Sequence, residues 1–313
     1  YTSPFRTSYY AYGNSTYAND ILKLILDTYS YREIDTELFS KEKTAVIVEM
    51  KKKMIKKDIV GQIKDLPIMM FGKSTKIQSD PQRHIDVVSK SKEKDLIEFM
   101  KKNYLSGRTT ITITGKFNKQ QVLKIINDLV LKIKKTPDLK KRQITQYKEG
   151  VFPKIKVIPE QNRKVTKIIL TFLVFNSYQY TKKYKAILLK TILSRIGDKS
   201  ILFDRLRSKL GVTYSPKADI DCYPYFGEFE ISLDVEPKNI EKTLIELSKI
   251  IKELKNNILD KQLVKLAKSR LQLDIKNSLY DINPTNYLKY TDKFIDNEEI
   301  INPLQVYNKY YKN

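Results

Sequence analysis

The feature that most constrains the fold is an order of strands and helices that occurs twice along the chain. In the first half, apolar residues recur with helical or alternating spacing, which predicts a half-buried strand at 109–115 and helices at 21–31, 36–57, 91–103 and 119–135. In the second half, three predicted strands are interleaved with helices: strands at 164–176, 212–221 and 227–235, and helices at 182–196, 200–210, 239–255 and 260–279. We therefore predict an α+β protein of two similar domains, each a mostly antiparallel sheet packed against helices.

A segment without helix or strand periodicity separates the two halves. It runs from 137 to 153 and contains Pro137, a basic run and Gly150, which together indicate a linker. We therefore predict a first domain at 1–136 and a second domain at 154–313. The residues 1–12 have the composition of a strand but begin without a turn or cap, so we expect the first domain to lack its start.

Length and composition indicate a folded protein, because 313 residues with a hydrophobic fraction of 41% can bury two cores of ordinary size. No apolar run reaches the roughly 18 residues of a membrane span. The single cysteine, Cys222, excludes an internal disulfide, and the single histidine, His84, excludes a histidine-rich metal centre within these residues. We expect Cys222 to be buried rather than reactive, His84 to be an exposed loop residue, and the compartment to be intracellular and reducing.

The chain is strongly basic, with 59 Lys and Arg residues against 36 Asp and Glu residues and a net charge of +23. Such a charge attracts nucleic acid, anionic membranes and acidic proteins. The lysines are spread along the whole chain instead of being gathered in one segment, which weakens the argument for nucleic acid. A basic nucleic-acid-binding protein nevertheless remains one alternative.

Two carboxylates, Glu42 and Glu49, lie seven residues apart in the predicted helix that carries SKEKTAVIVEMKKK. Seven residues are close to two helical turns, so both side chains leave the helix on the same side, beside an apolar run. Acidic residues in a lysine-rich helix are usually solvated, and a metal or catalytic site is the alternative interpretation. These residues alone leave both interpretations open.

Arg207, Gly211 and Tyr214 lie in the stretch LFDRLRSKLGVTYSP at 202–216. This stretch resembles a signature of the second half of the M16 zinc peptidases, the insulinase and mitochondrial processing peptidase-like family. Three further blocks resemble the same family in the same order: YTSPFRTSYY, EKTAVIVEMKKK and NYLSGRTTITITGKFNKQQV, at 1–10, 42–53 and 103–122. The four collinear blocks are distributed along residues 1–216 of the chain.

The resemblance implies a role for several residues. Glu49 corresponds to the glutamate that completes a zinc site, and Glu42 to an acid that supports the zinc ligands without binding the metal. Arg207 and Tyr214 correspond to residues that contact the substrate backbone and its polarised carbonyl. Finally, Tyr1 and Thr2 fall on the edge strand to which the family adds its peptide substrate.

The sequence departs from the family in one respect, because the His-x-x-Glu-His motif that supplies two zinc ligands and the catalytic base is not found in the 313 residues. We expect the remaining zinc ligands upstream of Tyr1. The resemblance then implies a zinc-dependent peptidase that acts on peptides or short unfolded segments enclosed between two domains, and that forms a homo- or hetero-dimer with another M16-type subunit. The alternative is a structural subunit that has kept this fold and lost the activity.

Overall fold

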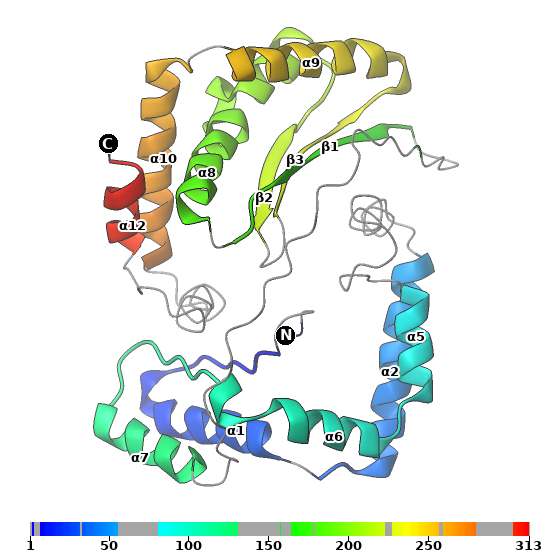
Figure 1. Cartoon of the computed structure of the whole chain (residues 1–313), viewed down its shortest axis with the longest axis vertical. Coiled ribbons are helices and arrows are strands. Elements are labelled where there is room, and N and C mark those ends of the chain that lie inside the picture. The colour runs from blue at the N-terminus through cyan, green and yellow to red at the C-terminus, as the bar shows by residue number, and fades with distance from the viewer. Residues whose placement is uncertain are drawn as a thin grey trace. The chain divides into compact units, whose positions relative to one another are not determined.

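The computed structural model describes residues 2, 7–31, 33–55, 81–130, 157, 164–177, 179–222, 227–256, 259–279 and 303–312 (Figure 1). The chain divides into two compact units. Unit 1 comprises residues 1–142 and 281–300, and unit 2 comprises residues 143–280 and 301–313. The predicted linker at 137–153 lies outside the described residues, so its conformation stays a prediction.

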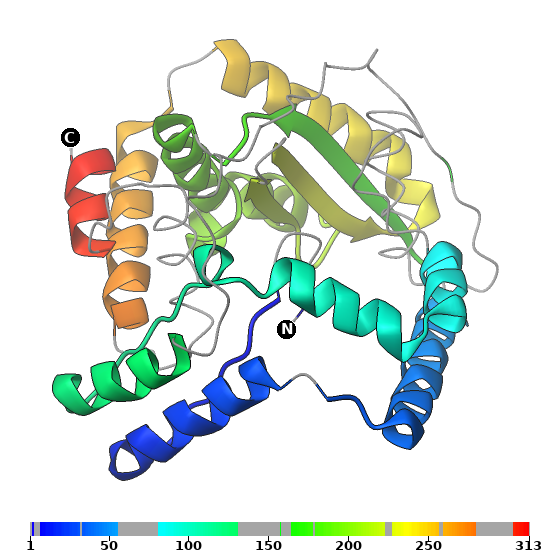
Figure 2. The same cartoon turned by 60° about the horizontal axis from the view of Figure 1, so that its bottom comes forward.

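Unit 1 is helical in its described part. It contains the short 3₁₀ helices η1 (Ser15–Tyr17) and η2 (Ser106–Arg108), and the α-helices α1 (Ala18–Ser30), α2 (Thr36–Ile55), α5 (Pro81–Lys90), α6 (Glu93–Asn103) and α7 (Lys119–Val130). Helix α1 lies beside α7, and α2 lies beside α5, as Figures 1 and 2 both show. Leu22 and Leu26 of α1 and Val122 of α7 are buried against one another and form a hydrophobic cluster in the described part of this unit.

Side chains at the helix starts explain where two of these helices begin. The Asp35 carboxylate accepts a hydrogen bond from the Leu38 N–H at the start of α2, at 2.7 Å. The side-chain Oδ1 atom of Asn118 accepts hydrogen bonds from the N–H groups of Gln120 and Gln121 at the start of α7. These contacts satisfy N–H groups that have no partner within the first turn of a helix.

The predicted strand at 109–115 is not a strand in this structure, and it pairs with no other described segment. Its residue Ile113 packs instead against the cluster of Leu22, Leu26 and Val122. An alternating pattern predicts which side chains are buried, but a strand also needs a neighbouring strand for its hydrogen bonds. The described residues of unit 1 contain one isolated antiparallel bridge, between Thr2 and Thr7, so the similarity of the two predicted domains stays a prediction.

Tyr9 connects the N-terminal segment to the helices of unit 1. Its hydroxyl group lies 2.9 Å from that of Tyr104, and its ring makes edge contacts with the rings of Tyr29 and Tyr104. Burial and the hydrogen bond with Tyr9 raise the pKa of Tyr104 above its ordinary value. Tyr104 therefore stays protonated, and its ring packs against those of Tyr9 and Tyr29.

Unit 2 contains an antiparallel sheet, which confirms the predicted α+β class. The strands β1 (Thr166–Val174), β2 (Lys217–Cys222) and β3 (Gly227–Val235) lie in the order β1-β3-β2. The described part of this unit contains the helices α8 (Tyr180–Ser194), α9 (Ile240–Asn256), α10 (Lys261–Leu279) and α12 (Pro303–Tyr310), the 3₁₀ turns η3 (Gly197–Lys199) and η5 (Pro237–Asn239), and the π-helix η4 (Phe203–Lys209). Helix α10 lies beside both α8 and α12, as the two views show.

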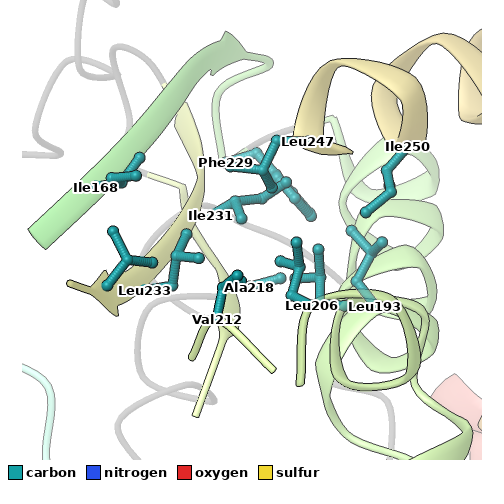
Figure 3. Close-up of a cluster of buried hydrophobic side chains, with 12 residues drawn as sticks. Ile168, Leu193, Leu206, Val212, Ala218, Phe229, Ile231, Leu233, Leu247 and Ile250 are labelled. Carbon is teal, nitrogen blue, oxygen red and sulfur yellow. The ribbon is translucent and has the colours of Figure 1, made fainter. Parts of the chain in front are cut away.

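The core of unit 2 lies between one face of the sheet and the helices η4 and α9 (Figure 3). Alternate residues of β3 point to this face, and all of them are buried: Phe229, Ile231, Leu233 and Val235. They meet Leu206 of η4 and two residues of α9, Leu247 and Ile250. Each side chain of this size stabilises the fold by about 1.5–3 kcal/mol through burial.

The opposite residues of β3, Glu228, Glu230, Ser232 and Asp234, lie on the other face of the sheet. The strand therefore alternates between a core face and a polar face along its whole length. In the part of the chain that the structure describes, no helix has both the length and the apolar character that a membrane span requires.

Candidate functional site

Arg207 and Tyr214 flank a tight reversal of the chain in unit 2. The chain runs from Ile201 and Leu202 into the π-helix η4, which ends where Gly211 adopts a φ of +59°. A backbone of this kind favours glycine, because other residues place their Cβ too close to the neighbouring carbonyl oxygen. Beyond Gly211 the chain buries Val212 in the core and then exposes Tyr214, whose side chain is 78% accessible to solvent.

The Arg207 guanidinium contacts two aromatic rings. It lies over the ring of Tyr214, 4.3 Å from its centroid, and over the ring of Phe203, 4.4 Å from its centroid. Its Nη1 atom also donates a hydrogen bond to the Tyr214 carbonyl oxygen, at 3.2 Å. The structure thus brings together the two residues that the sequence predicted as a pair, and adds Phe203, which sequence analysis did not single out.

Arg205 attaches η4 to the helix α9. Its guanidinium forms ion pairs with Glu246 and with Glu253, the latter at 2.8 Å. The hydrogen bond between Arg205 and Glu253 is the main cause of two pKa shifts. It raises the pKa of Arg205 and lowers the pKa of Glu253. Residues two apart on a helix do not share a side, so Arg205 contacts α9 while Arg207 leaves the helix in another direction.

Glu42 and Glu49 both lie on α2, as predicted, and both are exposed. A zinc site needs three or four protein ligands. Among the described residues there is no group of three His, Cys, Asp or Glu side chains that could hold a metal ion. The donors described in this chain therefore do not form a complete zinc site, and the role of Glu49 as a ligand stays a prediction.

His84 is exposed, as expected, but it lies on the helix α5 and not in a loop. Pro81 is the first residue of this helix, where the fixed φ of proline is compatible with helical geometry. The loop predicted around His84 is therefore a helix that begins at Pro81.

Thr2 and Tyr1 were predicted to bind a peptide through an edge strand. Thr2 is exposed and forms the isolated bridge with Thr7, while Tyr1 lies outside the described residues. Their predicted contact with a peptide stays a prediction.

An acidic surface on the polar face of the sheet was not predicted. The register of the strands places Asp219 opposite Glu230, and Asp221 opposite Glu228. Burial, with further contributions from Asp221 and Glu230, raises the pKa of Glu228 to about 7. Burial also raises the pKa of Asp221. The alternation in GEFEISLDV is the sequence signal for this surface, but only the register shows which carboxylates are opposed.

Lys190 is a cation that lies beside this acidic surface. Lys190 of α8 forms an ion pair with Asp219, at 2.5 Å. Burial acts to raise the pKa of Asp219, but the hydrogen bonds from Lys190 and from the Ile220 N–H lower it below its ordinary value. At the end of β2, Cys222 is half-buried, and burial raises the pKa of its thiol, which keeps it in the less reactive protonated form.

The antiparallel sheet and the helices packed against it make unit 2 a domain of the α+β class. The family described as "Peptidase M16 inactive domain" matches residues 92–271, which is more than half of the chain. The chain therefore belongs to the M16 peptidase family, as the sequence motifs predicted. The match is to the domain type that the family description calls inactive, and it runs through the predicted linker.

Solved structures with the same fold include a protease from Helicobacter pylori, which has 16% identity and a TM-score of 0.73 over 95% of this chain and 74% of that one. A peptidase M16 inactive domain from Pseudomonas fluorescens has 18% identity and a TM-score of 0.71 over 93% and 68% of the two chains. A chain of complex III2 from Candida albicans has 12% identity and a TM-score of 0.70 over 96% and 72%. No curated protein sequence is significantly similar to this chain.

Proposed function

We propose that this chain acts in the zinc-dependent hydrolysis of peptides or short unfolded protein segments, and that unit 2 supplies the groups that hold the peptide. The observation that carries the proposal is the contact between Arg207 and Tyr214, in which an arginine and an exposed phenol are held next to each other after a tight reversal of the chain. Membership of the M16 peptidase family supports the same function.

The two side chains are suited to contact a peptide backbone. A guanidinium has five N–H donors, and the Nη1 atom of Arg207 uses one of them on the Tyr214 carbonyl oxygen. The other donors are then able to bind carbonyl oxygens of a peptide. The exposed phenol of Tyr214 is a further donor, and donors of this kind stabilise the negative charge that develops on a carbonyl oxygen during attack.

Zinc is part of the proposal through Glu49, as a carboxylate ligand, and Glu42, as the acid that supports the ligands. When bound in a peptidase, zinc activates a water molecule at neutral pH. The 313 residues contain one histidine, so the proposed site needs histidine ligands from outside them.

The test is the zinc content and the peptidase activity of the full-length protein, measured for the wild type and for Glu49→Gln. We expect about one zinc ion per chain and activity on an unfolded substrate such as casein, both lost in the variant. The matched control is Glu37→Gln, which changes an exposed glutamate of the same helix that is paired with Lys41. A wild-type protein without stoichiometric zinc and without activity would contradict the proposal.

A second candidate is a catalytically inactive subunit with the M16 fold. Two observations favour it: the description of the matched domain as inactive, and the single histidine of the chain. This candidate predicts no zinc and a stable complex with another M16-type subunit. Light scattering coupled to size exclusion measures the complex, and the zinc assay above separates the two candidates.

A further inference from the structure

Phe203 and Arg207 lie four residues apart in the π-helix η4, and their side chains are in contact. The Arg207 guanidinium carbon is 4.4 Å from the centroid of the Phe203 ring. A cation at this distance is attracted by the negative face of the ring. Phe203 is partly buried, and it lies on the same helix as Leu206, which is fully buried in the core of unit 2.

The other ring beside Arg207 is held much less firmly. Tyr214 lies beyond the end of the helix and is 78% exposed, so its ring is packed less tightly than the partly buried ring of Phe203. An arginine side chain has large rotamer entropy, which a single mobile contact restricts poorly. Of the two rings that Arg207 contacts, Phe203 is therefore the one carried by a helix that is anchored in the core through Leu206.

The helix that carries Phe203 and Arg207 is itself fixed. Arg205, between them in sequence, forms ion pairs with Glu246 and Glu253 of α9. After the helix, the Gly211 N–H donates a hydrogen bond to the Arg207 carbonyl oxygen at 3.1 Å, and the Val212 N–H donates one to the Leu206 carbonyl oxygen at 3.0 Å. The backbone on both sides of Arg207 is therefore held, and the remaining freedom is that of its side chain.

We propose that Phe203 is a positioning residue for peptide binding, which acts by holding the guanidinium of Arg207 in the orientation that meets a peptide backbone. This inference rests on the proposed function, because it assigns to Phe203 a role in the same peptide contact. Phe203 does not itself need to touch the peptide. Its effect must therefore depend on the presence of Arg207.

The first experiment is a double-mutant cycle on the full-length protein, with the affinity for a fluorescein-labelled β-casein peptide measured by fluorescence anisotropy. Phe203→Leu keeps an apolar side chain and removes the ring, and we expect binding to weaken by about 3- to 20-fold, the range of a cation–π contact. In an Arg207→Met background, the same change is expected to have no further effect, because the partner of the ring is gone. Phe203→Tyr keeps an aromatic ring next to Arg207, and we expect this variant to bind the peptide with wild-type affinity.

The control is Phe172→Leu, which removes a partly exposed phenylalanine ring from β1 of the same unit. We expect it to leave peptide affinity unchanged. Equal losses from Phe203→Leu in the wild-type and Arg207→Met backgrounds would overturn the proposal, and so would an unchanged affinity of Phe203→Leu when the wild type binds the peptide.

A second readout does not depend on the proposed function. In the nuclear magnetic resonance spectrum of arginine-labelled protein, ring currents of Phe203 and Tyr214 shift the side-chain signals of Arg207, which Arg207→Lys identifies by their loss. We expect Phe203→Leu to remove a large part of this shift and to increase the mobility of the side chain. If the wild type binds no peptide, the proposed function fails, and this spectrum still decides whether Phe203 orders Arg207. An Arg207 signal that is mobile in the wild type, or unchanged by Phe203→Leu, would overturn the positioning role.

Discussion

At the scale of single residues, the planar guanidinium of Arg207 makes contacts that another cation cannot reproduce. It lies over the rings of Phe203 and Tyr214 and donates a hydrogen bond to a carbonyl oxygen. Arg207→Lys keeps the charge but loses the planar group and its directed donors. We expect the affinity for the casein peptide to fall about tenfold, which corresponds to about 1.4 kcal/mol. Fluorescence anisotropy checks this prediction.

The matched control for this change is Arg195→Lys, because Arg195 is an exposed arginine at the end of α8 in the same unit. We expect the control to bind the peptide with wild-type affinity at equal ionic strength. If Arg207→Lys binds as tightly as the wild type, charge alone explains the contact and the planar group has no role.

Glu228 makes the stability of the protein depend on pH. Its pKa is raised from the ordinary 4.5 to about 7 in the folded protein, first by burial and then by Asp221 and Glu230. Between these two pH values the folded protein keeps a proton that the unfolded chain releases, so the stability falls as the pH rises through this window. We expect Glu228→Gln to be more stable than the wild type at about pH 8, by on the order of 2 kcal/mol, and to differ little at about pH 4.

Chemical denaturation at the two pH values measures this difference. Asp234→Asn is the control, because Asp234 lies on the same face of β3 but is exposed. We expect it to show no comparable gain at high pH. A Glu228→Gln variant whose advantage does not change with pH would contradict the assignment.

At the scale of elements, the ion pairs of Arg205 hold η4 against α9. Glu246 is 13% exposed and Arg205 is 23% exposed, so a neutral partner would leave a charge poorly compensated in a partly buried place. We expect Glu246→Gln to reduce the free energy of unfolding by about 1–3 kcal/mol. Urea unfolding followed by circular dichroism measures the change.

The neighbouring pair of Lys209 and Asp204 provides the comparison, because both side chains are more exposed, at 65% and 41%. We expect Asp204→Asn to change the free energy of unfolding by less than about 1 kcal/mol, as is usual for exposed ion pairs. Equal effects of Glu246→Gln and Asp204→Asn would mean that Arg205 does not anchor the helix.

Local sequence patterns predicted many of these elements, because burial imposes a period on the residues that face a core. The strand β3 is an example: GEFEISLDV alternates, and its apolar residues are the buried ones. The segment 109–115 alternates too, yet the described residues offer it no strand to pair with. The spacing of apolar residues in the sequence also cannot distinguish a π-helix from an α-helix over the seven residues of η4.

Contacts between distant residues account for the features of the site that sequence analysis missed. Arg205 and Arg207 look alike in the sequence, but the partners of Arg205 lie 41 and 48 residues further along the chain. Arg207 and Tyr214 could be predicted because a short motif contains both residues. The contact of Phe203 with Arg207 depends on the rotamers of both side chains, which no spacing determines.

At the scale of the whole molecule, the described residues form a larger buried hydrophobic cluster in unit 2 than in unit 1. In the described part of unit 2, twelve buried residues from the sheet, its helices and the segment after η4 form one hydrophobic cluster. In the described part of unit 1, a cluster of three buried residues joins α1 to α7. Since buried apolar area is the main source of stability, the elements of unit 2 should open less readily than those helices.

Amide hydrogen exchange of the full-length protein, followed by mass spectrometry, tests this difference. We expect the slowest exchange in β3 and α9, and faster exchange in α1 and α7. Leu206→Ala removes a fully buried side chain of unit 2, and Leu26→Ala removes one of unit 1 that is 5% exposed; each change costs about 2–5 kcal/mol. Leu206→Ala should accelerate exchange in β3 and α9 but not in α1 and α7, and Leu26→Ala should do the reverse. If either variant accelerates exchange equally in both units, the two cores unfold as one cooperative structure, and the division of the chain into two units does not extend to its stability.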